Sequence, residues 1–333
     1  MTIQDLMNVP HAGRGRAWLR AALQHAIELE FSTIPPYLCG MWSISDLGNP
    51  AYGIIESVVM QEMLHMGLAC NMLAAIDGYP RIEDPEFVPD YPCELPGHVR
   101  PGLYVGLVGL YRELVRDVFM QIELPEHGPV PILAMMLAPR PVYSTIGDFY
   151  DAILELFQKL KPPVSEERQL DSSKVKLSKL ADLDAIECAI KQIKEQGEGT
   201  TQSPFVQDFS PDELAHYYRF MQIVVGKQIV KGQDGKAHWD DNSPLPFPTV
   251  YPMAMVPKGG YAPDLTRPFN EQFSAVLNFL QVAWQTGGAA GQASLESAYK
   301  AMRGLAKPAI ALMQQEIQSN SGRGNYGPDF RLL

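Results

Sequence analysis

Apolar side chains recur at spacings of three and four residues along several long stretches of the chain, which is the pattern of amphipathic helices. Between residues 16 and 34, for example, Leu19, Leu23, Ala26 and Glu30 share one face. The two prolines that follow predict that this helix ends or kinks there. A second helix, over about residues 52–76, is apolar almost all round, so we expect it at the centre of the molecule.

The remaining pattern predicts further helices separated by irregular stretches. They are expected over about residues 104–123, 146–160, 181–196, 210–225, 270–285 and 294–319. The proline-rich stretch 78–102 indicates a long crossover. Residues 161–179 are polar and charged, which predicts an exposed or mobile excursion. Residues 226–268 are rich in glycine and proline and are expected to hold a short hairpin. Strand signals are few, so the predicted fold class is mainly α.

The expected architecture is a four-helix bundle with long Pro-rich crossover loops and two extra C-terminal helices; the motifs and the resemblance described below carry this expectation. We expect residues 1–228 to form the bundle domain. Residues 229–333 are expected to form a loop-rich segment plus two helices that pack on the bundle.

Charge and cysteine content limit the partners and the compartment. The chain has 38 acidic and 27 basic side chains and a net charge of −11, which argues against nucleic acid and against anionic membranes. No apolar run reaches the roughly 18 residues of a membrane helix, and the N-terminal stretch lacks a signal-peptide core. The four cysteines lack disulfide or zinc spacing, which predicts reduced thiols in a cytoplasmic protein.

Two Glu-x-x-His motifs carry the candidate chemistry. Glu62 and His65 lie in the second predicted helix, and Glu213 and His216 lie in the helix predicted over residues 210–225. Residues three apart on a helix point to the same side, and both pairs are in line with apolar stripes. Burying such carboxylates is costly unless a cation or hydrogen bonds compensate. The motifs therefore predict a metal site inside the bundle.

A dinuclear carboxylate site of this type also needs one glutamate from each of the two other helices. In the first helix we favour Glu30 over Glu28, because Glu30 continues the apolar stripe. For the fourth helix we favour Glu198, because a short connection brings the end of its helix close to Glu213. Glu195 and Glu123 follow as alternates, with Glu155 last.

The other polar candidates near these motifs have weaker support. Tyr37 and Tyr217 are either hydrogen-bond partners of the ligands or core aromatics. His25 is expected to be a surface or capping histidine. A mixed imidazole and carboxylate ligand set suits iron or manganese better than calcium or magnesium. We therefore expect one or two iron ions, with manganese as the alternative.

Several segments resemble the ferritin-like proteins related to the iminophenylpyruvate dimer synthases of bisindole biosynthesis. The matching segments are Ala26-Ile27-Glu28-Leu29-Glu30, Thr33-Ile34-Pro35-Pro36-Tyr37-Leu38, Gln61-Glu62-Met63-Leu64-His65, Gln196-Gly197-Glu198-Gly199, His216-Tyr217-Tyr218-Arg219-Phe220, Val250-Tyr251-Pro252-Met253, Phe269-Asn270 and Gly327-Pro328-Asp329-Phe330. The resemblance implies a ferritin-like bundle with a mononuclear or dinuclear iron site. The first helix is also similar to ferritin, whose ligand glutamate is followed seven residues later by tyrosine, as Glu30 is by Tyr37.

The leading functional hypothesis is a metal-dependent, non-heme diiron oxidoreductase that acts on a small organic or amino-acid-derived substrate. In it Glu62 and Glu213 bridge the metals, and His65 and His216 are terminal ligands. One alternative is a non-redox, imine-coupling enzyme of secondary metabolism that works beside a partner oxidase. Another is a binding or scaffold protein with a degenerate metal site. We expect a homodimer, since bundles often pair through apolar helix faces.

Overall fold

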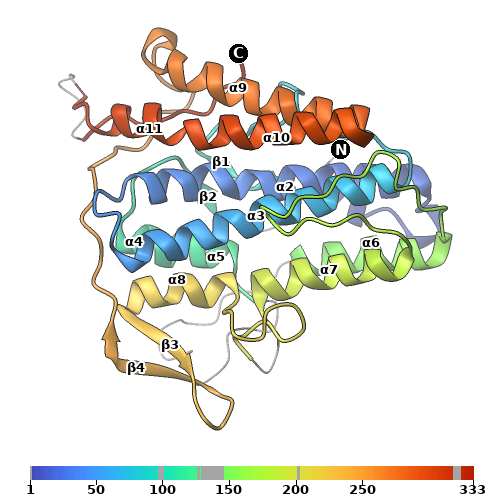
Figure 1. Ribbon diagram of the computed structural model, residues 1–333, viewed down its shortest axis with the longest axis horizontal. Coiled ribbons are helices and arrows are strands. Elements are labelled where there is room, and N and C mark those ends of the chain that lie inside the picture. The colour runs from blue at the N-terminus through green and yellow to red at the C-terminus, as the bar shows by residue number, and fades with distance from the viewer. Residues whose placement is uncertain (1, 97–100, 126–127, 129–145, 201–202, 318–323) are drawn as a thin grey trace.

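Two long helices, α2 (Arg16–Trp42) and α3 (Pro50–Ala75), lie side by side at the centre of the molecule (Figure 1). The computed structural model describes the chain except for residues 1, 97–100, 126–127, 129–145, 201–202 and 318–323. Every side chain from residue 29 to 42 and from 64 to 75 is buried, as the apolar composition of these stretches predicts.

Of the two outcomes predicted at the prolines, an end or a kink of the first helix, the end was wrong, because α2 continues through Pro35 and Pro36 to Trp42. A proline inside a helix has no N–H for the carbonyl four residues earlier. For Pro36 that carbonyl belongs to Ser32, and the hydroxyl of Tyr91 donates to it at 2.7 Å. A side chain from the crossover therefore replaces the missing helical hydrogen bond.

The third and fourth positions of the bundle are each filled by two helical pieces. The third consists of α4 (Arg112–Leu114), the π-helical turn η3 (Val115–Phe119) and α5 (Met120–Ile122), and then α6 (Ile146–Leu160). The fourth consists of α7 (Leu183–Glu198) and α8 (His216–Val225), which lie end to end below α3 in Figure 1. The bounds of α6 agree with its apolar periodicity.

The helix predicted over residues 210–225 starts later than expected, at His216. The cap signal at Ser210 predicts a helix from there, but Ser210 begins a turn in which its carbonyl accepts the Glu213 N–H at 2.8 Å. The chain is then extended. The Glu213 carbonyl accepts from Val206, and the Ala215 N–H donates to Pro204, both at 2.9 Å. This pairing holds Glu213 outside α8, so the second Glu-x-x-His motif does not lie on one helix.

The helix expected over residues 104–123 also begins later, at Arg112. Residues 104–110 are extended, because their backbone groups pair with other segments. The strand β2 (Tyr104–Val105) is antiparallel to β1 (Cys93–Glu94). Further along, the Leu107 carbonyl accepts from Val256 at 2.8 Å.

The segment of residues 161–179 is packed on the bundle, so the prediction of an exposed or mobile excursion was wrong. The side chains of Leu170, Leu177 and Leu180 are buried. The Asn71 amide of α3 donates to the Leu170 carbonyl at 2.8 Å. The Gln169 amide donates to the Leu180 carbonyl at 2.8 Å and its oxygen accepts from the Leu180 N–H at 2.7 Å. Buried amides thus satisfy the backbone of a segment whose charged residues point outward.

The C-terminal helices form a layer on the α2–α3 pair, along the top of Figure 1. They are α9 (Pro263–Thr286), α10 (Gly288–Gly304) and α11 (Ala306–Met313). Gly287 adopts φ +63° and separates α9 from α10, a conformation that favours glycine. The expected hairpin is present as β3 (Lys227–Lys231) and β4 (Ala237–Pro244), and the N-terminus adds α1 (Ile3–Met7) and the short η1 (His11–Gly13).

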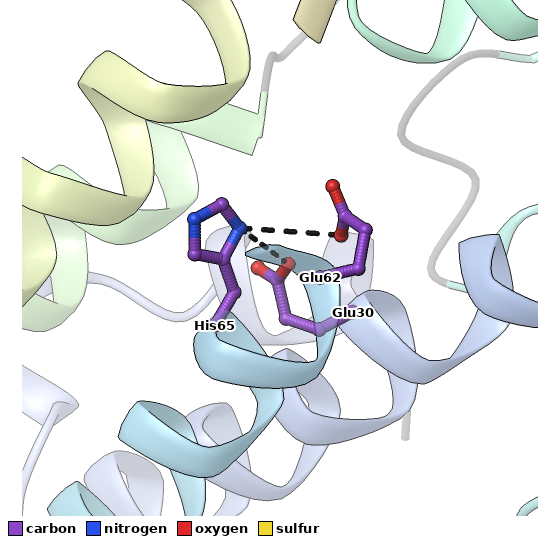
Figure 2. A group of neighbouring side chains, drawn as sticks. All are labelled: Glu30, Glu62 and His65. Carbon is purple, nitrogen blue, oxygen red and sulfur yellow. Dashed lines mark ion pairs between the residues drawn. The ribbon is translucent and has the colours of Figure 1, made fainter. Parts of the chain in front are cut away.

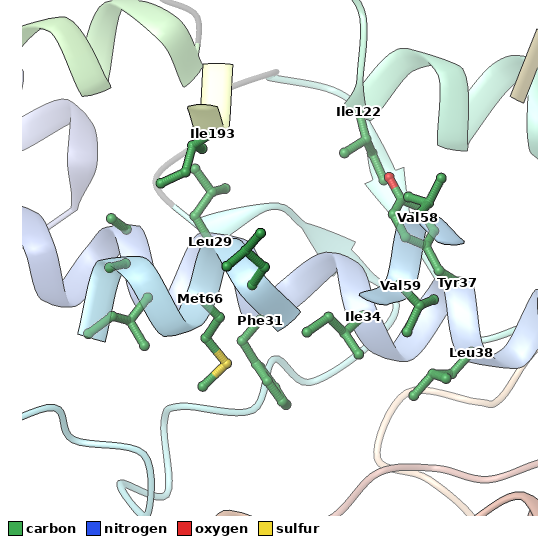
Figure 3. Packing of buried hydrophobic residues seen from close by; sticks show 14 of the residues in the cluster. Leu29, Phe31, Ile34, Tyr37, Leu38, Val58, Val59, Met66, Ile122 and Ile193 are labelled. Atoms are coloured by element: carbon green, nitrogen blue, oxygen red, sulfur yellow. The ribbon is translucent and has the colours of Figure 1, made fainter. Parts of the chain in front are cut away.

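The main core surrounds α2 and α3, where aliphatic and aromatic side chains from every part of the bundle meet (Figure 3). Leu29 and Ile34 of α2, Val58 of α3, Ile122 of α5 and Ile193 of α7 all belong to this core. In the part of the chain that the structure describes, no helix combines the length and the apolar character needed to cross a membrane.

Candidate metal centre

Three acidic and imidazole side chains of the two central helices converge inside the bundle. Glu30 of α2 and Glu62 and His65 of α3 are all buried and point toward one another (Figure 2). His65 Nδ1 lies 3.6 Å from Glu30 Oε2 and 4.0 Å from Glu62 Oε2. One ligand atom from each residue falls within 4.8 Å of the others, which is close enough for all three to share one cation.

A second group shares Glu62 with the first. Glu123, directly after α5, and His216, the first residue of α8, complete it. His216 Nδ1 lies 2.8 Å from Glu62 Oε1 and 3.4 Å from Glu123 Oε2. The rings of His65 and His216 are stacked with their centroids 5.5 Å apart. Because one carboxylate belongs to both groups, the arrangement can hold two ions joined by Glu62.

A hydroxyl group holds one oxygen of each carboxylate. Tyr150 of α6 donates to Glu30 Oε1, Thr33 donates to Glu62 Oε2 at 3.2 Å, and Tyr37 donates to Glu123 Oε1 at 2.5 Å. Burial and the nearby carboxylates raise the pKa of both tyrosines well above the ordinary value, so both phenols stay protonated and donate. These contacts fix the carboxylates in place.

A glutamine amide oxygen lies within hydrogen-bond distance of the outer nitrogen, Nε2, of each imidazole. His65 Nε2 lies 3.0 Å from Gln196 Oε1, and His216 Nε2 lies 2.9 Å from Gln61 Oε1. An amide oxygen only accepts, so in each neutral ring Nε2 carries the proton and Nδ1 has the lone pair. His216 Nδ1 is buried and makes no hydrogen bond. This lone pair therefore faces the carboxylate oxygens of Glu62 and Glu123, which are acceptors as well.

The charges around the centre are unbalanced. Among the described residues, no lysine or arginine forms an ion pair with Glu30, Glu62 or Glu123. Burial and the Glu123 and Glu30 carboxylates raise the pKa of Glu62 well above its ordinary value. Burial acts to lower the pKa of His65, but the adjacent glutamates outweigh it and raise it. Buried acceptors that face one another without a cation fit a site for divalent metal ions.

A small pocket of about 40 Å³ opens onto the centre. Four of the candidate ligands line it, namely Glu30, Glu62, His65 and Glu123, together with the aliphatic side chains of Leu29, Ile122, Ile146 and Ile193. Lys194 and Glu198 of α7 also line it, and both residues line a wider outer pocket of about 410 Å³ as well. Lys194 and Glu198 therefore lie between the inner pocket and the outer one.

Most of the other predicted candidates lie outside both groups. Glu28 contacts His25 at 2.6 Å. Glu213 contacts Arg219 and Gln61. Glu195 Oε2 accepts the Asp208 N–H at 3.4 Å, and Glu155 pairs with His11 near the surface. Glu198 lines the pocket, and Tyr217 packs edge-on against Tyr218.

Four side chains that contact the candidate ligands were missing from the sequence prediction: Thr33, Gln61, Tyr150 and Gln196. The sequence offers a signal for one of them, because Gln61 directly precedes the first Glu-x-x-His motif. The others depend on which residues of different helices meet.

Fold and site together define a class, namely a helical bundle whose interior carries carboxylate and histidine groups that could hold metal ions. The chain belongs to the ferritin-like family, because residues 23–225, more than half of its length, match the family model described as Ferritin-like. A crystal structure of a ferritin-like protein from Caulobacter vibrioides is similar, with a TM-score of 0.63 and 20% identity over 96% of this chain and 99% of that chain. At that identity the likeness shows the fold alone. No curated protein matches the chain.

Proposed function

We propose that the protein is a non-heme, metal-dependent oxidoreductase with two iron or manganese ions that acts on a small organic or amino-acid-derived molecule. The main support is the group of three buried carboxylates that face two imidazole rings without a lysine or arginine partner among the described residues, with His216 Nδ1 left without a hydrogen bond. The proposed ligands are Glu30, Glu62, His65, Glu123 and His216, with Glu62 shared. Iron or manganese bound there would supply redox chemistry with dioxygen as the oxidant.

The surrounding side chains have separate tasks in this proposal. Tyr37 and Tyr150 keep their protons and hold the outer carboxylate oxygens of Glu123 and Glu30. The aliphatic walls of the pocket exclude water from the reacting part of the substrate. Lys194 lies where the two pockets meet, with its ammonium 2.7 Å from the exposed Asp151 carboxylate. Exposed ion pairs of this kind are weak, so Lys194 can exchange Asp151 for a substrate carboxylate.

Metal analysis tests the proposal directly. Protein from iron- or manganese-supplemented cells should contain about two ions per chain, because the two ligand groups share Glu62. The double variant Glu62→Ala with His65→Ala should lose both, since it removes the shared ligand. Retention of the full metal content by this variant would show that the ions bind elsewhere.

The imine-coupling alternative depends on the segments that resemble the iminophenylpyruvate dimer synthases, and that relation stays a prediction. Oxygen consumption separates the two functions. An oxidoreductase consumes dioxygen with its substrate, whereas a coupling enzyme turns over anaerobically once the oxidised precursor is supplied. The homodimer, the partner oxidase, the two-part domain division and the cytoplasmic location also stay predictions.

A further inference from the structure

The glutamate of the second Glu-x-x-His motif is connected to the candidate metal centre by a series of polar contacts. Arg219 donates from Nη2 to Glu213 Oε2 at 3.3 Å. Gln61 donates from Nε2 to the same oxygen at 2.9 Å, and its amide oxygen lies 2.9 Å from His216 Nε2. Four side chains from α3, α8 and the segment before α8 are therefore linked in sequence, from a guanidinium to an imidazole.

The Glu213 carboxylate determines which way the Gln61 amide faces. A carboxylate only accepts hydrogen bonds, so the Gln61 group beside it must be the NH₂ group. The amide oxygen then faces His216, and Nε2 of that ring must carry the proton to donate to it. In the neutral ring the lone pair is consequently on Nδ1, the atom that lies beside Glu62 and Glu123.

The position of Glu213 is itself fixed. The extended pairing of its backbone with Val206 holds it outside α8. Its partner Arg219 is buried and anchored at two further points, since Nε donates to the Leu214 carbonyl at 2.6 Å and Nη1 donates to Ser57 Oγ at 2.8 Å. The same arginine therefore links α8, α3 and the segment that carries Glu213.

We propose that Glu213 is a positioning residue that acts through Gln61 to fix the tautomer and ring orientation of His216, so that Nδ1 is presented to a divalent cation held with Glu62 and Glu123. Hydrogen bonds to the outer nitrogen of a metal-binding histidine have this effect in other metal sites. The inference rests on the proposed metal site but assigns Glu213 a role other than that of a ligand. It also predicts that Glu213 affects only the ion at His216, because His65 has its own partner in Gln196.

Titration of the metal-free full chain with Co²⁺, followed by visible absorption and by competition with a chelator, tests this role. Glu213→Ala and Gln61→Ala should each weaken the binding of one of the two Co²⁺ ions about 10- to 100-fold and alter the absorption bands of that ion. The double variant should lose no more Co²⁺ affinity than Gln61→Ala alone, because Glu213 acts only through Gln61. Glu213→Gln should stay within about threefold of the wild type, since the introduced amide oxygen accepts from both Gln61 and Arg219.

A charge-exchanged variant provides a rescue. Gln61→Glu combined with Glu213→Gln places an acceptor on His216 Nε2 and keeps a donor–acceptor series to Arg219, so it should bind both ions as the wild type does. Asp212→Ala is the matched control, because its carboxylate neighbours Glu213 in the chain but is 95% exposed. Melting curves and circular dichroism of each variant establish that it is folded.

Three results would overturn the inference. Loss of one Co²⁺ in Glu213→Gln would make Glu213 a ligand. Unchanged binding in Glu213→Ala, or losses that multiply in the double variant, would disprove the connection through Gln61. In these cases the proposed metal function stands, because the wild type still binds metal. A wild-type chain that binds no Co²⁺, iron or manganese would remove both the inference and the proposed function.

Discussion

Replacement of Glu62 by glutamine should stabilise the metal-free protein although it removes the shared metal ligand. Glu62 is 3% exposed, and the ligand atoms of each group lie within 4.8 Å of one another. At an effective dielectric constant of about 20, two like charges at that distance repel by about 3 kcal/mol. Glu62 has such a neighbour on each side, Glu30 and Glu123. Glutamine keeps the shape and removes the charge, so we expect a gain of about 1–3 kcal/mol, or roughly 1–4 °C in Tm.

The gain should depend on pH in a defined direction. The pKa of Glu62 is raised in the folded protein, so its ionised form destabilises the fold. The stability of the metal-free wild type therefore falls as pH rises from the ordinary glutamate pKa of about 4.3 to the raised folded pKa. Glu62→Gln lacks this loss. The difference between the two proteins should grow across that pH range and then stay constant.

Scanning calorimetry of chelator-treated protein between about pH 5 and pH 9 measures this difference. Glu56→Gln on the exposed side of α3 is the control for the loss of one acidic charge. Added Fe²⁺ or Mn²⁺ should raise the Tm of the wild type but not that of Glu62→Gln. A Glu62→Gln protein that melts below the metal-free wild type at high pH would refute the argument that the centre needs a cation.

Two substitutions test contacts that hold the fold together, and a labelling experiment tests the order of cysteine reactivity. Tyr91→Phe leaves a buried carbonyl inside α2 without a donor and should cost about 1–3 kcal/mol in urea unfolding, whereas Tyr104→Phe, which is 64% exposed, should have no effect; equal effects would contradict the role of the Tyr91 hydroxyl. Asn71→Ala removes the amide that holds the segment before α7 and should cost about 3 kcal/mol and open that segment to proteases, so unchanged proteolysis would refute it. A thiol reagent at pH 8 should modify the exposed Cys188 first, because burial raises the pKa of Cys93 to about 11; a fast phase that survives Cys188→Ser would contradict this order.

Periodicity was sufficient where a helix depends on its own residues. The apolar repeat predicted the bounds of α6 and placed Glu30 on the inward side of α2. It failed at the prolines of α2, because the hydroxyl that replaces the lost hydrogen bond comes from a residue 59 positions away from its acceptor. A local pattern cannot contain that information.

In the candidate site, too, local spacing predicted some positions, and contacts with distant segments decided the others. The first Glu-x-x-His motif lies on one helix, and its residues converge as the spacing predicts. The second motif has the same spacing, but the backbone around Glu213 pairs with residues 204–206. Glu213 and His216 therefore do not share a helix face, although they are three residues apart. The short connection to Glu213 favours Glu198 over Glu123, but the partners of Glu123, Tyr37 and His216, come from distant segments that a connectivity argument does not include. Long-range pairing of the backbone therefore decides which glutamates reach the centre.

The breaks in the third and fourth positions of the bundle divide the candidate centre into a fixed half and an adjustable half. Glu30, Glu62 and His65 lie within uninterrupted helices, whereas Glu123 follows α5 and His216 begins α8. The ligands within α2 and α3 are therefore positioned by the register of these two helices, whereas those at the ends of α5 and α8 also depend on the chain that joins each helix to its neighbour. A change at these helix ends should thus displace Glu123 and His216 before it displaces Glu30, Glu62 or His65.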